Sequence, residues 1–76
     1  MGIGIEIRKL RVQNHYSQEY VAFYLGITRN AYIKWEKDGV NLNLKQLSTL
    51  AELYELEMID FLIKVLRITG MSKQTV

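Results

Sequence analysis

The sequence predicts an all-α protein with five helices. Proline is absent from all 76 residues, and the chain contains no repeat or low-complexity tract. Apolar residues recur at every third or fourth position along most of its length, which is the spacing of one buried helix face. With 49% hydrophobic residues, the chain can build one small core. We therefore expect a single domain over residues 1–69 and a frayed tail at 70–76.

Capping residues place the first two helices. The first is expected to run from Ile3 or Ile5 to Asn14. The second begins after Ser17, because a serine hydroxyl can accept a hydrogen bond from an otherwise unpaired backbone N–H. It ends at Gly26, because the left-handed conformation that terminates many helices costs little only for glycine.

Similar signals bound the three later helices. Thr28 and Asn43 are good caps for the third and fourth helices, and Asp38 with Gly39 marks a stop before a loop at 40–43. The expected ranges are Thr28 to Lys37, Asn43 to Tyr54, and Met58 to Ile68.

The twenty residues from Gln18 to Lys37 predict two short helices that cross at a glycine turn. Apolar or small residues stand where the two helices would touch, at Val21, Ala22, Leu25, Ile27, Tyr32 and Trp35. Polar and basic residues open the second of these helices, namely Arg29, Asn30 and Lys34. A helix with such a face can lie in the major groove of DNA. This segment therefore predicts DNA binding.

The charge distribution favours the same function. The net charge of +2 is weak evidence alone, but residues 1–50 carry seven Lys or Arg against four acids, whereas residues 51–76 carry three against four. The basic excess lies with the predicted helix-turn-helix, so this end of the molecule would turn toward phosphate.

Several segments together resemble the lambda-repressor-like, XRE-type helix-turn-helix family over about residues 5–63. They are IRKLR in the first helix, SQEYVA and LGITRNAYIKWE across the turn, and LKQLSTLAELYELEMIDFL behind it. The resemblance implies a five-helix, lambda-repressor-like domain that binds double-stranded DNA in a sequence-specific way. It also implies a regulator of transcription, most simply a repressor, that acts as a homodimer.

The resemblance further implies roles for individual residues. Gln18 would anchor to a DNA phosphate, and Arg11 would form a structural ion pair with Glu36. The expected DNA-binding residues are Gln18, Thr28, Arg29, Asn30, Ile33, Lys34 and Lys37. Phe23 and Tyr24 occupy positions that are usually polar in the family, where they are either tolerated or part of an interface.

Side-chain chemistry is compatible with these roles. Arg29 could donate two parallel hydrogen bonds to guanine, Asn30 could pair with adenine, and Ile33 could pack on thymine methyl groups. The first turn of a helix offers free N–H groups, which suits Gln18 and its neighbours to a phosphate. The alternatives are plain solvent exposure for the charged and amide side chains, a capping role for Asn30, and a stray surface position for Ile33.

The fifth predicted helix carries a second functional clue. It is apolar on more than one face, and a domain this small cannot cover every face with its own core. The surplus predicts an isologous dimer, which would place two recognition helices about 34 Å apart. The expected dimer interface comprises Phe61, Leu62, Val65, Leu66 and Ile68. The alternative is that this surface packs on a C-terminal domain.

Other classes of protein are disfavoured. The chain has no cysteine and a single histidine, His15, so we expect no metal and no cofactor. Ser17 lies close to His15, but no acid is placed to orient the imidazole, so we expect no enzyme. The N-terminus lacks a secretory signal, and Asp60, Lys64 and Arg67 interrupt the most apolar stretch. We therefore expect a cytoplasmic protein that does not enter a membrane.

Two other functions stay open from the sequence. The chain could be an antitoxin, or another interaction module, that binds a toxin or other partner protein through the apolar stretch 58–68. It could also be a helix-turn-helix domain that only assembles larger complexes. The chemistry of Gln18, Arg29 and Lys34 suits DNA and argues against the last of these.

Overall fold

The computed structural model describes residues 3–38 and 42–66, which form five α-helices. They are α1 (Ile3–Gln13), α2 (Gln18–Leu25), α3 (Arg29–Asp38), α4 (Leu44–Leu53) and α5 (Met58–Leu66). No strand occurs in these two ranges, and the predicted all-α class is confirmed. The predicted stop at Gly39, residues 40 and 41 of the predicted loop, Ile68 and the tail 70–76 lie outside the described residues.

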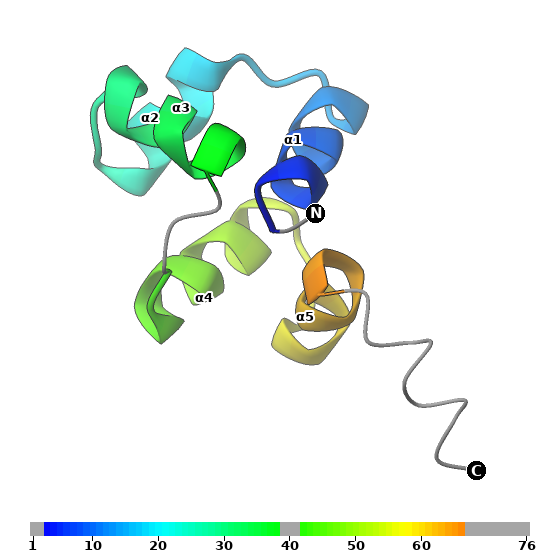
Figure 1. The fold of residues 1–76 in the computed structure, drawn as a ribbon. Coiled ribbons are helices and arrows are strands. Elements are labelled where there is room, and N and C mark those ends of the chain that lie inside the picture. Colours follow the sequence, from blue (N-terminus) through cyan, green and yellow to red (C-terminus); the bar gives the residue numbers. More distant parts are fainter. Residues whose placement is uncertain (1–2, 39–41, 67–76) are drawn as a thin grey trace, which may run out of the picture.

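The five helices surround one shared core. In Figure 1, α2 and α3 lie side by side at the upper left, α1 lies to their right, and α4 and α5 lie below. α1 contacts both α3 and α5, while α4 contacts both α2 and α5. Every helix contributes to the buried apolar set, which is Ile7, Leu10, Val21, Ala22, Tyr32, Trp35, Leu50, Ala51, Leu53, Tyr54, Phe61 and Val65. Burial of each large aliphatic or aromatic side chain contributes roughly 1.5–3 kcal/mol.

Side-chain caps fix where α2 and α4 begin. Ser17 Oγ accepts a hydrogen bond from the backbone N–H of Tyr20 at 2.9 Å, as its position predicts. Asn43 Oδ1 accepts from the backbone N–H of Gln46 at 2.8 Å, and Gln46 Oε1 accepts from the backbone N–H of Asn43 at 2.9 Å. This reciprocal pair is a capping box, so two otherwise orphaned N–H groups are satisfied at once.

Gly4 sets how closely α1 approaches the end of α3. A Cβ atom at this position would stand 2.5 Å from the carbonyl oxygen of Glu36 and 2.7 Å from that of Trp35. Those neighbours are backbone atoms, which cannot swing away as the end of a long side chain can. Glycine is therefore needed here for contact between two helices, and α3 is held against the start of α1.

The inward face of α5 differs from the expected one. Phe61 is 0% exposed and Val65 2%, and both belong to the core of the single chain. Their own chain covers both side chains, so the dimer contact that we propose does not depend on Phe61 and Val65. Leu62 is half-buried, and Ile59 is 61% exposed. Among the described residues, the outward surface of α5 therefore includes Ile59, which was not predicted, as well as Leu62.

Candidate nucleic-acid interface

A tight turn sets the orientation of α3 relative to α2. Gly26 adopts the left-handed conformation, with φ 74° and ψ 29°, as predicted. The backbone N–H of Ile27 donates to the carbonyl of Ala22 at 3.0 Å, which closes the end of α2. Thr28 Oγ1 then accepts from the backbone N–H of Ala31 at 3.1 Å and opens α3. The direction of α3 is thus fixed by backbone geometry and two local hydrogen bonds.

α3 has a buried face and a cationic face. Its inward residues Tyr32, Trp35 and Glu36 are buried. Its outward side carries most of the predicted DNA contacts: Arg29, Asn30, Lys34 and Lys37 are exposed, and Ile33 is half-buried. Among the described residues, none of the three cations on this side forms an ion pair. Their charges therefore remain available to an anionic partner.

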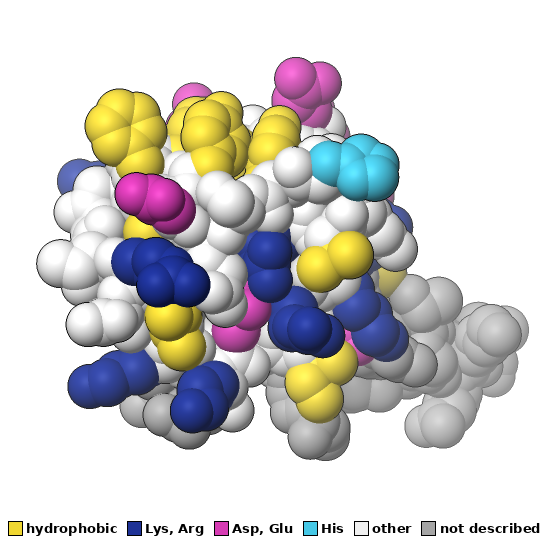
Figure 2. Space-filling view, turned by 90° about the horizontal axis from the view of Figure 1, so that it is seen from above, with side chains coloured by type: hydrophobic (Ala, Val, Ile, Leu, Met, Phe, Trp, Pro, Cys, Tyr) yellow, Lys and Arg dark blue, Asp and Glu magenta, His cyan; other side chains and the backbone are white. Residues whose placement is uncertain are grey.

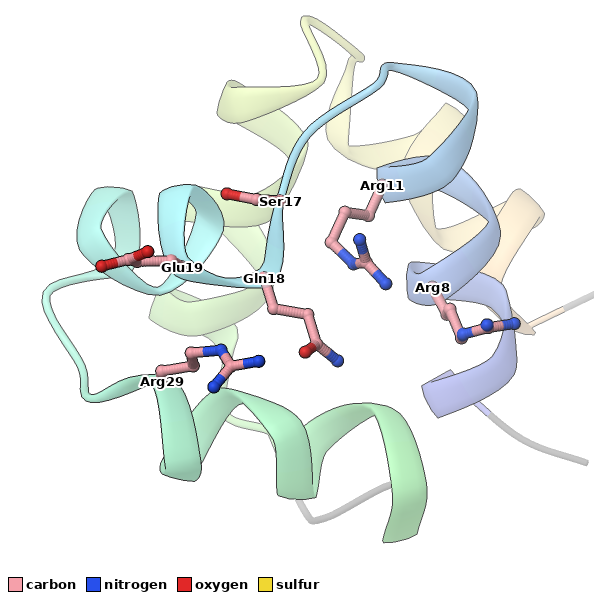
Figure 3. Close-up of a pocket in the computed structure, with 6 residues that line it drawn as sticks. All are labelled: Arg8, Arg11, Ser17, Gln18, Glu19 and Arg29. Carbon is pink, nitrogen blue, oxygen red and sulfur yellow. The ribbon is translucent and has the colours of Figure 1, made fainter.

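A polar depression of about 610 Å³ adjoins the first residue of α3. It is lined by Arg8, Arg11, Ser17, Gln18, Glu19 and Arg29, which come from α1, the start of α2 and the start of α3. In Figure 3, Arg29 extends from α3 toward Gln18, and Glu19 points the opposite way. Figure 2 shows that Lys and Arg side chains gather over the middle and lower part of this view. The depression is thus part of a broader cationic surface.

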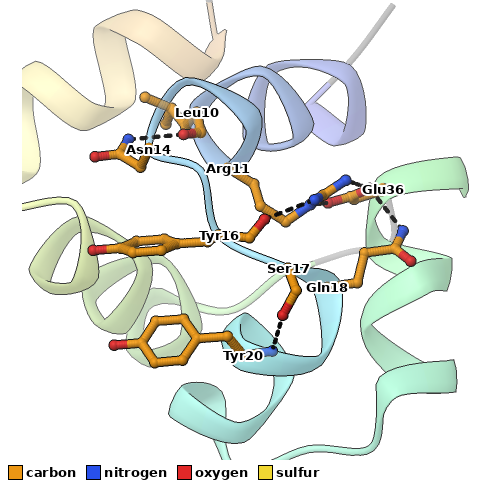
Figure 4. A network of polar contacts seen from close by, with 8 residues as sticks. All are labelled: Leu10, Arg11, Asn14, Tyr16, Ser17, Gln18, Tyr20 and Glu36. Atoms are coloured by element: carbon orange, nitrogen blue, oxygen red, sulfur yellow. Dashed lines mark hydrogen bonds and ion pairs between the residues drawn. The ribbon is translucent and has the colours of Figure 1, made fainter.

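Arg11, which lines this depression, forms an ion pair with the buried carboxylate of Glu36. Arg11 Nε donates to Glu36 Oε2 at 2.6 Å, and Arg11 Nη1 donates to the carbonyl of Tyr16 at 2.9 Å (Figure 4). The structure therefore contains the ion pair that the family resemblance implies. Glu36 neutralises Arg11, whereas Arg8 and Arg29, which also line the depression, form no ion pair with any described residue.

Glu36 also holds Gln18. Gln18 Nε2 donates to Glu36 Oε1 at 3.2 Å (Figure 4). Burial alone would raise the pKa of Glu36, but the hydrogen bonds from Arg11 and Gln18 favour the charged form, and the pKa lies below its usual value. Hydrogen bonding to the same carboxylate raises the pKa of Arg11. An amide nitrogen has two hydrogens, so Gln18 keeps one donor for a further acceptor beside the N-terminus of α2.

Arg8 is the functional candidate that the sequence reading omitted. It is exposed on α1, and its guanidinium is turned outward in Figure 3. The spacing from Arg8 to Arg11 is one helical turn, which was a usable signal. Nothing in the sequence, however, indicated that this turn of α1 would lie beside the starts of α2 and α3.

The fold and this cationic surface define a helix-turn-helix protein, and comparison with known proteins agrees. The chain belongs to the helix-turn-helix family, which it matches over residues 7–61. This confirms the resemblance to XRE-type proteins and supports DNA binding in the regulation of transcription.

One similar protein is the SPbeta prophage-derived uncharacterized HTH-type transcriptional regulator YonR of Bacillus subtilis (strain 168). The two are 38% identical over 61 residues, which cover 80% of this chain and 56% of the relative. The chain thus spans little more than half the length of that relative. No solved structure matches the chain.

Within residues 3–38 and 42–66, no three His, Asp or Glu side chains are grouped so that they could hold a metal ion. None of the five described helices is both long enough and apolar enough to cross a membrane.

Proposed function

We propose that this protein is a sequence-specific transcriptional repressor that acts in the cytoplasm and binds a near-palindromic operator as a homodimer. The observation that supports this most directly is the outward side of α3, where Arg29, Lys34 and Lys37 are exposed and form no ion pair with any described residue. Arg29 also lines the polar depression. We take residues 1–69 as the domain that performs this function. α3 would enter the major groove, and the start of α2 would rest on the sugar–phosphate backbone.

The outward residues of α3 would contact different parts of the DNA. Arg29 and Asn30 are in the first turn of the helix, where side chains reach base edges most readily. Lys34 lies more than one turn further on and would contact a base or the backbone. Ile33, being half-buried, can offer only part of its surface to a thymine methyl group.

The remaining contacts would be to phosphate. Gln18 is held by Glu36 with one amide hydrogen free, and Arg8 borders the same depression. Lys37 is exposed near the end of α3. Thr28 uses its hydroxyl as a helix cap, so a DNA contact from this residue would be secondary to that role. Phosphate contacts of this kind fix register on the duplex and make binding sensitive to salt.

Dimerisation would use the outward surface of α5. Of the residues first expected there, Leu62 remains half-exposed; the side chain of Leu66 and all of Ile68 lie outside the described structure. Ile59 is exposed on the same helix and joins this surface. A two-fold axis through it would pair two copies of α3, as a near-palindromic operator requires.

Selection from randomised duplex DNA near physiological salt tests the proposal. Purified protein is incubated with the pool, and the bound DNA is sequenced. The expected result is an enriched near-palindrome with half-sites about ten base pairs apart. Binding that depends on salt but enriches no sequence would contradict a sequence-specific repressor.

A second function deserves a test because Ile59 leaves an apolar side chain exposed on α5. The protein could be an antitoxin that binds a toxin, or another protein, through this helix. Co-expression with the product of an adjacent small reading frame would reveal such a partner as a stable complex. Loss of that complex in Ile59→Glu, with DNA binding retained, would favour the antitoxin.

A further inference from the structure

An aromatic patch covers the outer side of α2. It consists of Tyr16, Tyr20, Phe23 and Tyr24, of which Phe23 is 80% exposed and Tyr20 and Tyr24 are also exposed. The ring centroids of Tyr16 and Tyr20 are 4.8 Å apart. Figure 4 shows these two rings on the side of α2 that faces away from Glu36. The aromatic patch is therefore separate from the polar depression and from the outward side of α3.

Acidic side chains border the aromatic patch. Glu19 is exposed and lies one helical turn before Phe23. Glu52 is exposed on α4, the helix that packs against α2. Loss of water around the hydroxyl and, to a smaller extent, the negative charge of Glu52 raise the pKa of Tyr24. In Figure 2, hydrophobic side chains gather along the upper edge with acidic ones among them, away from most of the cations. Glu19 also lines the polar depression. Beside the aromatic patch, this acidic rim favours a partner that is apolar and basic.

α1 carries a surface with the complementary character. Ile5 and Val12 are both exposed, and their spacing of seven residues puts them on one face of the helix. Arg8 and Lys9 are exposed between them, on either side of that line. Lys9 Nζ is 3.8 Å from Glu6 Oε2, a contact too long and too exposed to cancel its charge. We call these four residues, Ile5, Arg8, Lys9 and Val12, the α1 stripe.

We propose that a second copy of this chain docks its α1 stripe on the aromatic patch, so that copies associate head to tail. If two aromatic patches met, Glu19 and Glu52 of one copy would lie near the same acids of the other copy and repel them. If the α1 stripe docks instead, Arg8 and Lys9 lie near those acids and attract them. The contact joins two different surfaces, so it does not close on itself and can extend through many copies. Neither surface includes α5 or the outward residues of α3. Arg8, however, belongs to both the α1 stripe and the proposed DNA interface, so a copy bound to DNA would offer its aromatic patch rather than its α1 stripe to a neighbour.

Mixing two variants tests this proposal. Phe23→Ser damages only the aromatic patch, and Ile5→Asp damages only the α1 stripe; both side chains are exposed, so both variants should fold. Sedimentation velocity without DNA, at low salt and rising protein concentration, measures association. Wild-type protein should form species that grow with concentration and shrink as salt is added. Each variant alone should keep the two-fold dimer proposed for α5 but should form species larger than that dimer at least about tenfold more weakly.

The mixture distinguishes head-to-tail contact from a symmetric one. In an equimolar mixture, Ile5→Asp supplies an intact aromatic patch and Phe23→Ser supplies an intact α1 stripe, so larger species should reappear. A mixture no larger than its separate components would overturn the proposal, as would undiminished association of Phe23→Ser alone. Leu44→Ser is the matched control, because Leu44 is an exposed large apolar residue in neither surface and its variant should behave as wild type.

The proposal and the DNA-binding function can fail independently. Phe23→Ser should bind a single operator as tightly as wild-type protein, because the aromatic patch includes none of the proposed DNA contacts. A protein that associates but selects no DNA sequence would refute the repressor and leave the head-to-tail contact intact.

Discussion

Glu36 is a buried acid beneath a surface that is otherwise cationic. Its carboxylate neutralises Arg11 and holds the amide of Gln18. A buried ion pair is weak evidence for net stability, because desolvation offsets much of the attraction. Removing one partner is different, because the remaining charge is left uncompensated. The role we assign to Glu36 is therefore positional: it fixes where Arg11 and Gln18 stand beside the start of α2.

Glu36→Gln should destabilise the protein by roughly 3–5 kcal/mol at neutral pH, because it leaves the charge of Arg11 unpaired. The folded-state pKa of Glu36 is lowered, so the stabilisation from its charged form is complete above the ordinary carboxyl pKa of 4.5. That stabilisation is lost as pH falls from there through the folded-state pKa. Denaturant unfolding at several pH values should therefore show the curves of wild type and variant converging in acid.

Glu19→Gln supplies the control for this pH dependence. Glu19 is an exposed carboxylate that forms no ion pair with any described residue. Its loss should change the unfolding free energy by less than about 1 kcal/mol, chiefly through the dipole of α2. A gap between wild type and Glu36→Gln that stays constant from neutral to acid pH would show that ionisation of Glu36 is not what stabilises the fold.

Arg29 should read a base. Arg29→Ala is expected to cost about 1–3 kcal/mol on the selected operator, because two parallel hydrogen bonds to one base would be lost. Preference at that single base pair should relax, while preference at the others persists. Competition binding against a set of single-base operator variants measures both effects. Equal weakening on every sequence would instead make Arg29 a phosphate contact.

Arg8, unlike Arg29, should contact a phosphate and not a base. Arg8→Ala is expected to weaken binding evenly across sequences and to lower the slope of log affinity against log salt by about 1, the effect of losing one phosphate contact. Lys64→Ala on α5 is the matched control, since it removes an exposed cation outside the polar depression. An unchanged slope for Arg8→Ala would remove Arg8 from the DNA interface.

At the scale of helices, the closeness of α1 to α3 depends on Gly4. Gly4→Ala should gain up to about 1 kcal/mol of helix propensity. It should lose more, about 1–3 kcal/mol net, because the new methyl group meets two backbone carbonyls and forces the helices apart. Thermal unfolding measures the difference. Gln13→Ala, an exposed change on the same helix, should stay within about 0.5 kcal/mol of wild type. A more stable Gly4→Ala would mean that α1 moves away from α3 without cost.

The boundaries of the helices could largely be predicted because they depend on local chemistry. The helix ends are set by the hydroxyl of Ser17, the backbone of Gly26 and the amide of Asn43. Each of these groups acts on residues only a few positions away, so its effect can be predicted from the sequence. The backbone conformation of His15 and Glu55 was not predicted. Both adopt positive φ, at 60° and 55°, which residues other than glycine rarely do and no side-chain pattern marks.

The faces of α5 were harder to predict, for a reason that belongs to packing. Apolar residues occur on most sides of α5, so their spacing alone did not show which side faces the core. In the folded chain α5 packs against α1 and α4, and the side that contains Phe61 and Val65 is buried. The same limit hid Arg8, which lines the same depression as Arg29 because of how three helices meet. Local signals place residues on an element, but assembly decides which residues become neighbours.

At the scale of the whole molecule, the corrected surface of α5 changes which substitution tests the dimer. A charge at Phe61 would unfold the chain, since that side chain is fully covered, and loss of binding would then have two explanations. Ile59 is 61% exposed, so Ile59→Glu should leave the circular dichroism spectrum and the thermal midpoint nearly unchanged. If α5 forms the two-fold contact, this variant should sediment as a monomer at concentrations where wild-type protein is dimeric.

Binding to whole and half operators then separates dimerisation from recognition. Ile59→Glu keeps every residue of α3, so on a single half-site it should bind as tightly as a wild-type monomer. On the full operator it should bind at least about tenfold more weakly than wild-type protein, because its two copies no longer arrive as a joined pair. Dimers that persist in Ile59→Glu, with full operator affinity, would place the two-fold contact on another surface than α5.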